Sequence, residues 1–517
     1  MAKEACKTKC TDCTCSKQSC NKPYESEKTK LAWKDAGKKY TGSVDDEFDV
    51  IVVGSGPGGY LAAEMAGKAG LKTLIVEKEF WGGVCLNIGC IPTKAMLKST
   101  HVLEEILDAA KYGIEANFAD LKIDYDKTWL KMHERKAKVV AQLSGGVKML
   151  MKGSKCQVID GDAEFVGAKE IKVNGKVYRA KNLIIATGSH ARRMKNIEGF
   201  EKGYESGKLL SSREAINYNK NLPKSMVIVG GGVIGVEFAQ VYAAVGTKVT
   251  IIQREDRLLP GVDKDVATEI TKVLQNDNKI EIIFNASSSK LDSDESLVYV
   301  KDGKEEKISA DVILIATGRI PASEKLEEVG VKLGARKEVL VDEFMRTNVK
   351  GVYAIGDVTG QNMLAHVAYS HAVTAVYHIL DVYGIPYKPE SKPVPACIYT
   401  NPEIAFVGLT EQQATDAGYN VITSKYSFSF LGKAIAASQT KGFVKLVVNK
   451  ENGHILGAHM IGANVTDYVA EIALAIEKGA CVKDLTHTIH PHPTFNEIIW
   501  EAARSALHKL TLENLKK

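Results

Sequence analysis

Three observations predict that this 517-residue chain is an α/β protein with two similar β-α-β domains and a different C-terminal domain. A glycine-rich segment near residue 50 recurs near residue 230. The strand ending IIATG at 184–188 recurs as LIATG at 314–318, and the pattern of apolar residues changes at residue 393. The length allows about three to four domains of roughly 100–200 residues. With 45% hydrophobic and 25% charged residues, the composition is typical of a globular protein.

The first 46 residues are expected to form a mobile extension, because they are rich in Lys, Ser, Thr and Cys and poor in large apolar residues. They lack the apolar run of a secretory signal, and no stretch of 18 apolar residues predicts a membrane span. The net charge is only +5 and no basic stripe predicts nucleic-acid binding. A cytoplasmic location is therefore expected. The cysteines of the extension are Cys6, Cys10, Cys13, Cys15 and Cys20.

These five cysteines leave two interpretations open, namely a disordered tail with reactive thiols or a metal–thiolate site. We favour the tail, and no metal site is predicted.

The first β-α-β unit begins with FDVIVVG, which predicts a buried strand from Phe48. The motif GSGPGG follows, with Gly54 for a tight turn, Gly56 for close approach to a pyrophosphate, and Gly59 for helix–strand packing. Glu77, at the end of the second strand, can accept hydrogen bonds from ribose hydroxyls. The unit therefore predicts an adenine dinucleotide bound at a helix N-terminus.

The second unit, MVIVGGGVIGVEFAQ, repeats this pattern before another strand. Its glycines are Gly230, Gly232 and Gly235. Gln253 stands where an acidic residue would indicate NAD, and it repels a 2′-phosphate less than Glu would. Arg254 and Arg257 could attract such a phosphate, whereas a third glycine in the motif is usual for NAD sites. NAD is therefore predicted, with NADP as the alternative.

Cys85 and Cys90 form a close pair in WGGVCLNIGCIPTK. Zinc usually takes four protein ligands, and no second pair lies nearby in the sequence. A structural disulfide is a poor alternative, because so short a loop stabilises a cytosolic protein little. Pro92 predicts the start of a helix, which places Cys90 near a helix N-terminus, where a thiolate is favoured. We therefore interpret the pair as redox-active.

The sequence from Pro393 onward alternates apolar and polar residues around a turn at 451–453, which predicts an antiparallel sheet. A helix is expected at 468–478. In HPHPTFNE, His492 and Glu497 can form a base with an orienting carboxylate. His487 and His490 are predicted to be bystanders.

Together these motifs resemble those of the flavoprotein disulfide reductases over about residues 47–510, most closely the members that oxidise dihydrolipoamide. The motifs are GSGPGG, GGVCLNIGCIPTK, GGGVIGVE, VYAIGDVTG, MLAHVA, PACIYTNPEIAFVG and HPHPTFNE. The resemblance implies a homodimer that uses FAD and NAD. It also implies a lipoyl domain as partner, from a 2-oxoacid dehydrogenase complex or the glycine cleavage system, and the sequence does not say which.

The resemblance also implies an order of domains after the extension at 1–46. The implied segments are an FAD-binding domain at 47–190, an NAD-binding domain at 191–316, a part completing the FAD-binding domain at 317–390, and a dimerisation domain at 391–517.

Roles of single residues follow from the same resemblance. Cys85 exchanges disulfides with the substrate and Cys90 touches the flavin. His492, oriented by Glu497 and contributed by the second subunit, takes a proton from a dihydrolipoyl thiol, whose thiolate then attacks the Cys85–Cys90 disulfide. Electrons pass through FAD to NAD⁺, and the His492–Pro493 bond is expected to be cis.

The resemblance places Lys94 near the flavin, with Glu237 as its salt-bridge partner. Gly318 is implied to line the NAD site. The remaining implied flavin contacts are Ala163, Thr187, Gly188, Ser189, Asp357, Met363, Leu364, Ala365 and His366.

Departures from the family pattern keep alternatives open. Val84 stands where relatives commonly have Thr, and the extension has no counterpart. The alternatives are a glutathione-type or mercuric reductase that uses NADPH, or a non-catalytic assembly subunit. The end TLENLKK lacks the cysteine pair usual in mercuric reductases, and an assembly subunit is expected to lack Cys85, Cys90 or His492, all of which are present.

Overall fold

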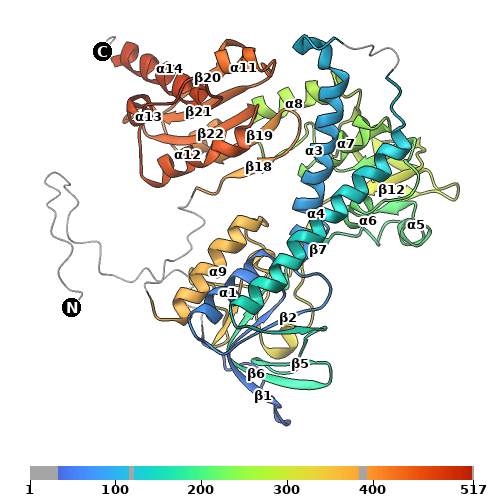
Figure 1. Cartoon of the computed structure of the whole chain (residues 1–517), viewed down its shortest axis with the longest axis vertical. Coiled ribbons are helices and arrows are strands. Elements are labelled where there is room, and N and C mark those ends of the chain that lie inside the picture. Colours follow the sequence, from blue (N-terminus) through green and yellow to red (C-terminus); the bar gives the residue numbers. More distant parts are fainter. Residues whose placement is uncertain (1–32, 116–120, 383–392, 515–517) are drawn as a thin grey trace, which may run out of the picture.

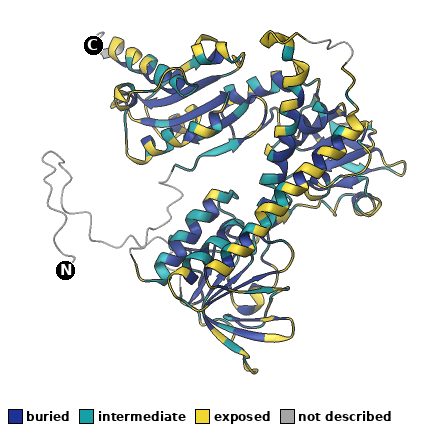
Figure 2. Ribbon diagram, viewed as in Figure 1, coloured by how far each residue is buried: buried dark blue, intermediate teal, exposed yellow. Residues whose placement is uncertain are grey.

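The computed structural model describes residues 33–115, 121–382 and 393–514, whose strands form five sheets (Figure 1). Two β-α-β sheets, the first mixed and the second parallel, lie beside a C-terminal antiparallel sheet with its own helices, so the predicted α/β fold class is confirmed. The central strands of the sheets are buried, and exposed residues gather on the outer faces of the helices, in loops and on edge strands such as β14 (Figure 2). Among the described helices we find none whose length and hydropathy would let it span a lipid bilayer.

The first sheet has the order β3-β2-β1-β6-β5-β4, and β17 also pairs with β6. Its strands are β1 (Asp46–Val53), β2 (Thr73–Glu77), β3 (Gln157–Asp160), β4 (Glu164–Phe165), β5 (Glu170–Val173), β6 (Lys176–Ile185) and β17 (Val352–Ala354). The pairs β1–β2, β1–β6, β2–β3 and β6–β17 are parallel. Two helices, α1 (Pro57–Lys68) and α9 (Ala365–Ile379), lie side by side against this sheet (Figure 1).

Strand β17 comes late in the chain, yet it lies in the first sheet. Val352 pairs with Leu183, and Ala354 pairs with Ile185. Central parallel strands are covered on both faces, which explains why the apolar residues of β1, β2 and β17 are nearly all buried. This pairing supports our proposal that residues 317–390 complete the domain that begins at residue 47.

The second sheet is entirely parallel, in the order β11-β10-β9-β15-β8. Its strands are β8 (Leu209–Leu210), β9 (Ser225–Val229), β10 (Lys248–Ile252), β11 (Glu281–Ile283) and β15 (Val312–Ile315). The antiparallel strands β12 (Ala286–Leu291), β13 (Leu297–Lys301) and β14 (Lys304–Ile308) form a meander that precedes β15. The helices of this part are α5 (Phe200–Ser206), α6 (Ser212–Ile216), α7 (Val233–Ala244) and α8 (Lys264–Asn276).

A two-stranded ladder joins the two β-α-β parts. It pairs β7 (Ser189–Ala191), which leaves the first sheet, with β16 (Arg319–Pro321), which leaves the second. Three helices, α2 (Gly83–Asn87), α3 (Cys90–Leu107) and α4 (Tyr125–Gly153), connect β2 to β3. Helix α4 reaches from the first sheet to the second (Figure 1), where Trp129 Nε1 donates to Tyr218 O at 2.9 Å. Helix α3 begins at Cys90, two residues before the start that Pro92 predicts.

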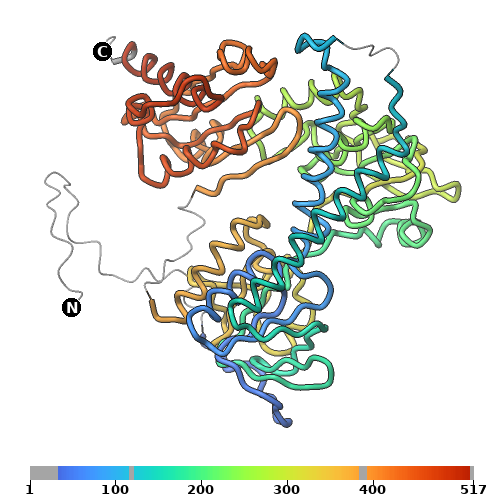
Figure 3. Tube along the Cα trace, viewed as in Figure 1, coloured from blue at the N-terminus to red at the C-terminus, as the bar shows by residue number. Residues whose placement is uncertain are grey.

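The C-terminal antiparallel sheet has the order β18-β19-β22-β21-β20. Its strands are β18 (Ala396–Ile398), β19 (Glu403–Gly408), β20 (Val421–Ser427), β21 (Phe443–Asn449) and β22 (Ile455–Gly462). Its helices are α10 (Glu411–Asp416), α11 (Gly432–Ala436), α12 (Val465–Glu477), α13 (Val482–His487) and α14 (Glu497–Asn514). The expected turn at 451–453 joins β21 to β22, and the expected helix is α12. In Figure 3 the C-terminal sheet and its helices appear in orange and red, as a body separate from the first sheet and its helices.

Short 3₁₀ helices complete the described elements. They are η2 (Ala109–Tyr112), η4 (Glu327–Val329), η5 (Gly356–Thr359) and η6 (Phe428–Phe430).

The prediction of a mobile extension is wrong for residues 33–46. Trp33 makes edge contacts with the rings of Tyr353 and His378. Asp35 forms an ion pair with Lys332 at 3.0 Å. The composition of the whole extension concealed these contacts, because they depend on a few side chains near its end. The five cysteines of the extension lie outside the described residues.

Candidate active site

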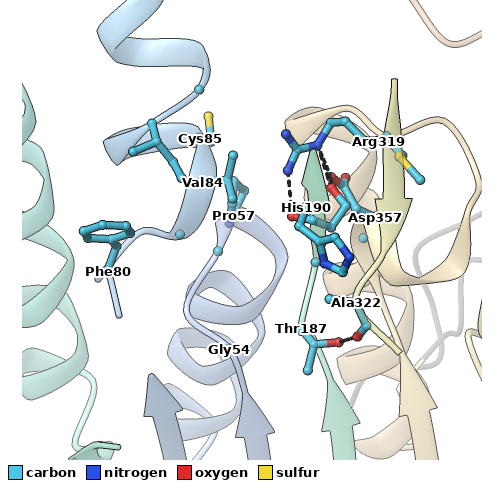
Figure 4. Close-up of a pocket in the computed structure, with 18 of the residues that line it drawn as sticks. Gly54, Pro57, Phe80, Val84, Cys85, Thr187, His190, Arg319, Ala322 and Asp357 are labelled. Atoms are coloured by element: carbon cyan, nitrogen blue, oxygen red, sulfur yellow. Dashed lines mark hydrogen bonds and ion pairs between the residues drawn. The ribbon is translucent and has the colours of Figure 1, made fainter. Parts of the chain in front are cut away.

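A cavity of about 1600 Å³, here called the central cavity, lies between the first sheet, α3 and the β7–β16 ladder. It is larger than the roughly 300–1,000 Å³ of most small-molecule sites. In Figure 4, Pro57 and Cys85 lie on one side, and Thr187, Arg319 and Asp357 lie on the other. The volume of the central cavity suits a dinucleotide.

The glycine-rich turn between β1 and α1 forms one end of the central cavity. Gly54 has a φ of +101°, and a Cβ atom there would lie 2.3 Å from Ala186 O. A Cβ atom at Gly59 would lie 1.9 Å from Gly54 O, so only glycine lets α1 approach β1 so closely. A Cβ atom at Gly56 would meet nothing within 4 Å, because this residue faces the cavity. The turn therefore leaves room for a pyrophosphate at the N-terminus of α1.

Glu77 is buried at the end of β2 and lines the same cavity. Its Oε2 accepts from Ser55 N at 2.8 Å and from Ser55 Oγ at 2.7 Å. Its Oε1 accepts from Glu79 N at 2.8 Å and from Phe80 N at 3.1 Å. These donors hold the carboxylate next to the glycine-rich turn, which is the place where a ribose would lie.

Cys85 on α2 and Cys90 at the start of α3 both line the central cavity as free thiols. The Cys85 thiol donates a hydrogen bond to the Cys90 sulfur. This hydrogen bond lowers the pKa of Cys90 to about 7. The charge of Lys94 also lowers this pKa, whereas burial raises it. The same hydrogen bond and burial raise the pKa of Cys85. Near neutral pH the reduced pair therefore holds its thiolate on Cys90, where the N-terminus of α3 adds support.

Lys94 and Glu237 lie together, as the family resemblance implies. Lys94 Nζ donates to both carboxylate oxygens of Glu237, at 2.9 and 3.0 Å. Tyr399 N donates to Glu237 Oε1 at 2.9 Å, and the Lys94 ammonium lies 4.6 Å from the centre of the Tyr399 ring. Since the Glu237 side chain is only 5% exposed, this arrangement firmly connects α3, α7 and the end of β18. Tyr399 was not predicted, although it lies in the quoted motif PACIYTNPEIAFVG.

Asp357 lies across the cavity from the thiols. Ser189 Oγ donates to Asp357 Oδ2 at 2.5 Å and accepts from Arg319 Nε at 2.8 Å. Arg319 was missed in the sequence, although it follows the predicted Gly318 directly. Thr187 Oγ1 donates to Ala322 O at 2.6 Å, which fixes the turn before β7 (Figure 4).

His371 on α9 is a second residue that the sequence analysis missed. Its Nδ1 accepts from Gly356 N at 3.1 Å, directly before Asp357. Burial lowers the pKa of His371 to about 4, so the imidazole is neutral and can accept this bond. No local motif identifies His371, because its role is to accept a hydrogen bond from Gly356, which precedes Asp357 in another part of the chain.

Several other predicted flavin contacts also line the central cavity. They are Ala163, Gly188, Met363, Leu364, Ala365 and His366. Val84, the departure from the family pattern, lines it as well.

The second glycine-rich turn lies between β9 and α7 and repeats the close approaches of the first. Gly230 has a φ of +111°, and a Cβ atom at Gly235 would lie 2.0 Å from Gly230 O. A Cβ atom at Gly232 would meet nothing within 4 Å. Gln253, directly after β10, accepts a hydrogen bond from Gly231 N at 2.9 Å. Gly318 lies between β15 and β16, at a φ of +113°.

His492 and Glu497 lie together in the C-terminal domain. His492 Nδ1 is 2.8 Å from Glu497 Oε1, and Thr494 N donates to Glu497 Oε2 at 2.8 Å. Burial alone would raise the pKa of Glu497, but these two hydrogen bonds hold it below its ordinary value. His490 differs from His492, because its side chain is only 5% exposed and bonds to Glu471. The expected cis bond between His492 and Pro493 is present.

The His492–Glu497 pair does not line the central cavity of its own chain. The His492 side chain is instead 75% exposed, so its Nε2 is open to a group outside this chain.

Comparisons with known proteins agree with this geometry. Residues 48–372 match a family model described as pyridine nucleotide-disulphide oxidoreductase, and residues 394–503 match the dimerisation domain of that family. A dihydrolipoyl dehydrogenase of Mycoplasma genitalium is 41% identical over 462 residues, covering 89% of this chain and 99% of the relative. One of Geobacillus stearothermophilus is 41% identical, covering 89% and 96%.

Among solved structures, the HOCl-induced flavoprotein disulfide reductase RclA from Escherichia coli is similar to this chain. The match has a TM-score of 0.76 at 25% identity and covers 88% of this chain and 99% of that one.

Proposed function

The chain belongs to the pyridine nucleotide-disulphide oxidoreductases, and on this premise we propose that it oxidises dihydrolipoyl groups with NAD⁺, using FAD. The observation that carries the proposal is the Cys85–Cys90 pair, which shares one cavity with the dinucleotide turn of β1 and α1. The relatives named dihydrolipoyl dehydrogenase match nearly from end to end, which supports the same activity here.

The residues of the two glycine-rich turns fit FAD and NAD. At the first turn, Gly56 faces an open cavity at a helix N-terminus, and Glu77 and Asp357 line that cavity. At the second turn, Gly232 is open in the same way. When bound, FAD supplies an acceptor for the electron pair of the dithiol and passes a hydride to NAD⁺.

The first half of the proposed reaction is thiol–disulfide exchange. His492 Nε2 takes a proton from one dihydrolipoyl thiol, while Glu497 orients the ring and stabilises its positive charge. The substrate thiolate attacks Cys85 Sγ of the Cys85–Cys90 disulfide, so that this S–S bond breaks and a mixed disulfide forms on Cys85. Cys90 leaves as a thiolate, which the charge of Lys94 and the N-terminus of α3 stabilise.

The second exchange releases the product. The remaining substrate thiol loses its proton and attacks the substrate sulfur that is bonded to Cys85. The mixed disulfide breaks, Cys85 leaves and takes up a proton, and the lipoyl disulfide forms. The substrate has then lost two electrons and two protons, and the Cys85–Cys90 pair holds both electrons as a thiol and a thiolate.

The chain forms a homodimer through its C-terminal domain. We propose that each site uses the partner subunit's His492. In one chain the exposed His492–Glu497 pair lies outside the central cavity, which supports a site completed by the second subunit.

We also propose a lipoyl domain of a 2-oxoacid dehydrogenase complex or of the glycine cleavage system as the physiological partner, because such a domain carries the dithiol substrate. A cytoplasmic location is proposed as well, since a reducing compartment suits free thiols elsewhere in the chain.

Steady-state kinetics of the purified holoenzyme test the proposed function. We expect dihydrolipoamide with NAD⁺ to give the highest kcat/KM. The other assays are dihydrolipoamide with NADP⁺, and glutathione disulfide and Hg(II), each with NADH and with NADPH. A higher value for glutathione disulfide or Hg(II) would identify a different reductase. Absence of turnover with all three would instead favour an assembly subunit.

A further inference from the structure

The two glycine-rich turns differ at the residue that closes each of them. Glu77 ends β2 and accepts from Ser55 N at 2.8 Å. Gln253 directly follows β10 and accepts from Gly231 N at 2.9 Å. Because Ser55 and Gly231 each follow the first glycine of their turn, Glu77 and Gln253 occupy the same place in the repeat. That place faces the adenosine ribose of a bound dinucleotide.

Two hydrogen bonds fix the orientation of the Gln253 amide group, which is buried. Its Oε1 accepts from Gly231 N, and its Nε2 donates to Arg257 O at 3.0 Å. A primary amide has two N–H donors and an oxygen with two lone pairs. The group therefore retains one donor and one acceptor for a ligand, and it brings no negative charge to the ribose.

Two arginines, Arg254 and Arg257, follow Gln253, with two acidic residues, Glu255 and Asp256, between them. Arg254 is 79% exposed and pairs with Glu255 at 2.9 Å. Such exposed ion pairs are weak, so a phosphate can replace Glu255 as the partner of Arg254. The Arg257 guanidinium donates to Pro260 O at 2.8 Å, which holds it on the same loop.

We propose that Gln253 makes this coenzyme site tolerant of a 2′-phosphate, so that the protein uses NADP(H) as well as NAD(H). A carboxylate at this place accepts from ribose hydroxyls but repels a 2′-phosphate, which is also negative. The Gln253 amide keeps the hydrogen bond to a 2′-hydroxyl and removes the repulsion, while Arg254 supplies a counter-charge. The inference rests on the proposed function only in requiring that the second turn binds a nicotinamide coenzyme.

Binding of adenosine fragments isolates this site from catalysis. Isothermal titration of the FAD-loaded dimer with 5′-AMP and with adenosine 2′,5′-bisphosphate would give both dissociation constants. We expect the two values to lie within about tenfold of each other in the wild-type protein. Gln253→Glu is expected to weaken the bisphosphate at least about tenfold, because one unit charge is then placed near the phosphate. Its affinity for 5′-AMP should change by less than about threefold.

Gln275→Glu is the matched control, because it makes the same chemical change at an exposed position near the end of α8. It should leave both dissociation constants unchanged. The kcat/KM values for NAD⁺ and NADP⁺ should follow the same order as the fragment affinities.

Two results would overturn the inference. One is a wild-type protein that binds the bisphosphate more than about 100-fold more weakly than 5′-AMP, which is the discrimination expected of a strict NAD site. The other is a Gln253→Glu variant that loses affinity for both fragments equally. Failure of dihydrolipoamide oxidation with the fragment affinities as expected would refute the proposed function and leave this inference standing.

Discussion

At the scale of single residues, the reactivity of the thiol pair depends on the hydrogen bond from Cys85 to Cys90. Because this bond lowers the pKa of Cys90 to about 7, the Cys90 thiolate forms as pH rises through 7 and is lost below it. Alkylation of Cys90 in the reduced protein, followed by peptide mass spectrometry across pH, should therefore show a midpoint near 7. An ordinary thiol has its midpoint at about 8.5.

Cys85→Ala removes the donor of this hydrogen bond, so the alkylation midpoint of Cys90 should move upward. Cys481→Ala, a change in the C-terminal domain, should leave it in place. An unchanged midpoint in Cys85→Ala would show that the hydrogen bond does not control the thiolate.

The exposed imidazole of His492 gives a second prediction at this scale. His492→Gln removes the proton acceptor, so dihydrolipoamide oxidation should fall by about 10²–10⁴, the usual effect of a general base. Flavin reduction by NADH, followed by absorbance under anaerobic conditions, should change little. His487→Gln serves as the control, because His487 is exposed at the end of α13. Equal losses in both half-reactions would point to a folding defect.

At the scale of elements, two glycines of the β1–α1 turn have different roles, Gly59 in packing and Gly56 in ligand binding. Gly59→Ala puts a methyl group 1.9 Å from Gly54 O, and we expect it to lower the unfolding free energy of the apoprotein by about 1–3 kcal/mol. Gly56→Ala meets nothing within 4 Å, so it should leave the unfolding free energy unchanged but weaken FAD retention. Denaturant unfolding and FAD titration of the two apoproteins would measure this. Equal destabilisation by both changes would contradict the geometry.

The same elements show how far the sequence predicts the structure. The glycine turns and the start of α3 could be predicted because their chemistry lies within a few neighbouring residues. Lys94 and Glu237 are far apart in the chain, so only the family resemblance brought them together. His371 gives no local signal, because it acts by contacting an element from another part of the sequence. Tyr399 lies in a quoted motif, but its partners Glu237 and Lys94 come from distant parts of the sequence. Trp33 was missed because the extension was judged by its average composition.

At the scale of the whole molecule, a buried lysine connects the C-terminal sheet to the second β-α-β domain. Lys445 on β21 is 7% exposed and lies 3.2 Å from Asp263, 3.2 Å from Asp265 and 2.9 Å from Glu411. Lys445→Ala leaves the buried carboxylate of Asp263 without its cation, so it should lower the unfolding free energy by about 3–5 kcal/mol. Lys441→Ala, which breaks an exposed pair with Asp277, should cost less than about 1 kcal/mol. Thermal and denaturant unfolding would distinguish the two.

The connection through Lys445 also gives a direction for pH dependence. Burial alone would raise the pKa of Asp265, but Lys445 holds it below its ordinary value. A group with a lowered pKa contributes stability above its unfolded value, about 3.9 for Asp, and this contribution is lost as pH falls through its folded value. Acidification below about pH 4 should therefore weaken the wild-type protein more than Lys445→Ala. If the wild-type protein and Lys445→Ala lost stability equally on acidification, the Lys445–Asp265 pair would not be the cause of the acid sensitivity.

The most direct test of the account is the redox state of each cysteine after one turnover. The oxidised holoenzyme is mixed anaerobically with one equivalent of dihydrolipoamide per site and no NAD⁺, quenched in acid, alkylated and analysed by peptide mass spectrometry. The account predicts that Cys85 and Cys90 change together from a disulfide to two alkylated thiols, while Cys156, Cys397 and Cys481 do not change. Formation of lipoyl disulfide while both the Cys85–Cys90 disulfide and the FAD remain oxidised would contradict it.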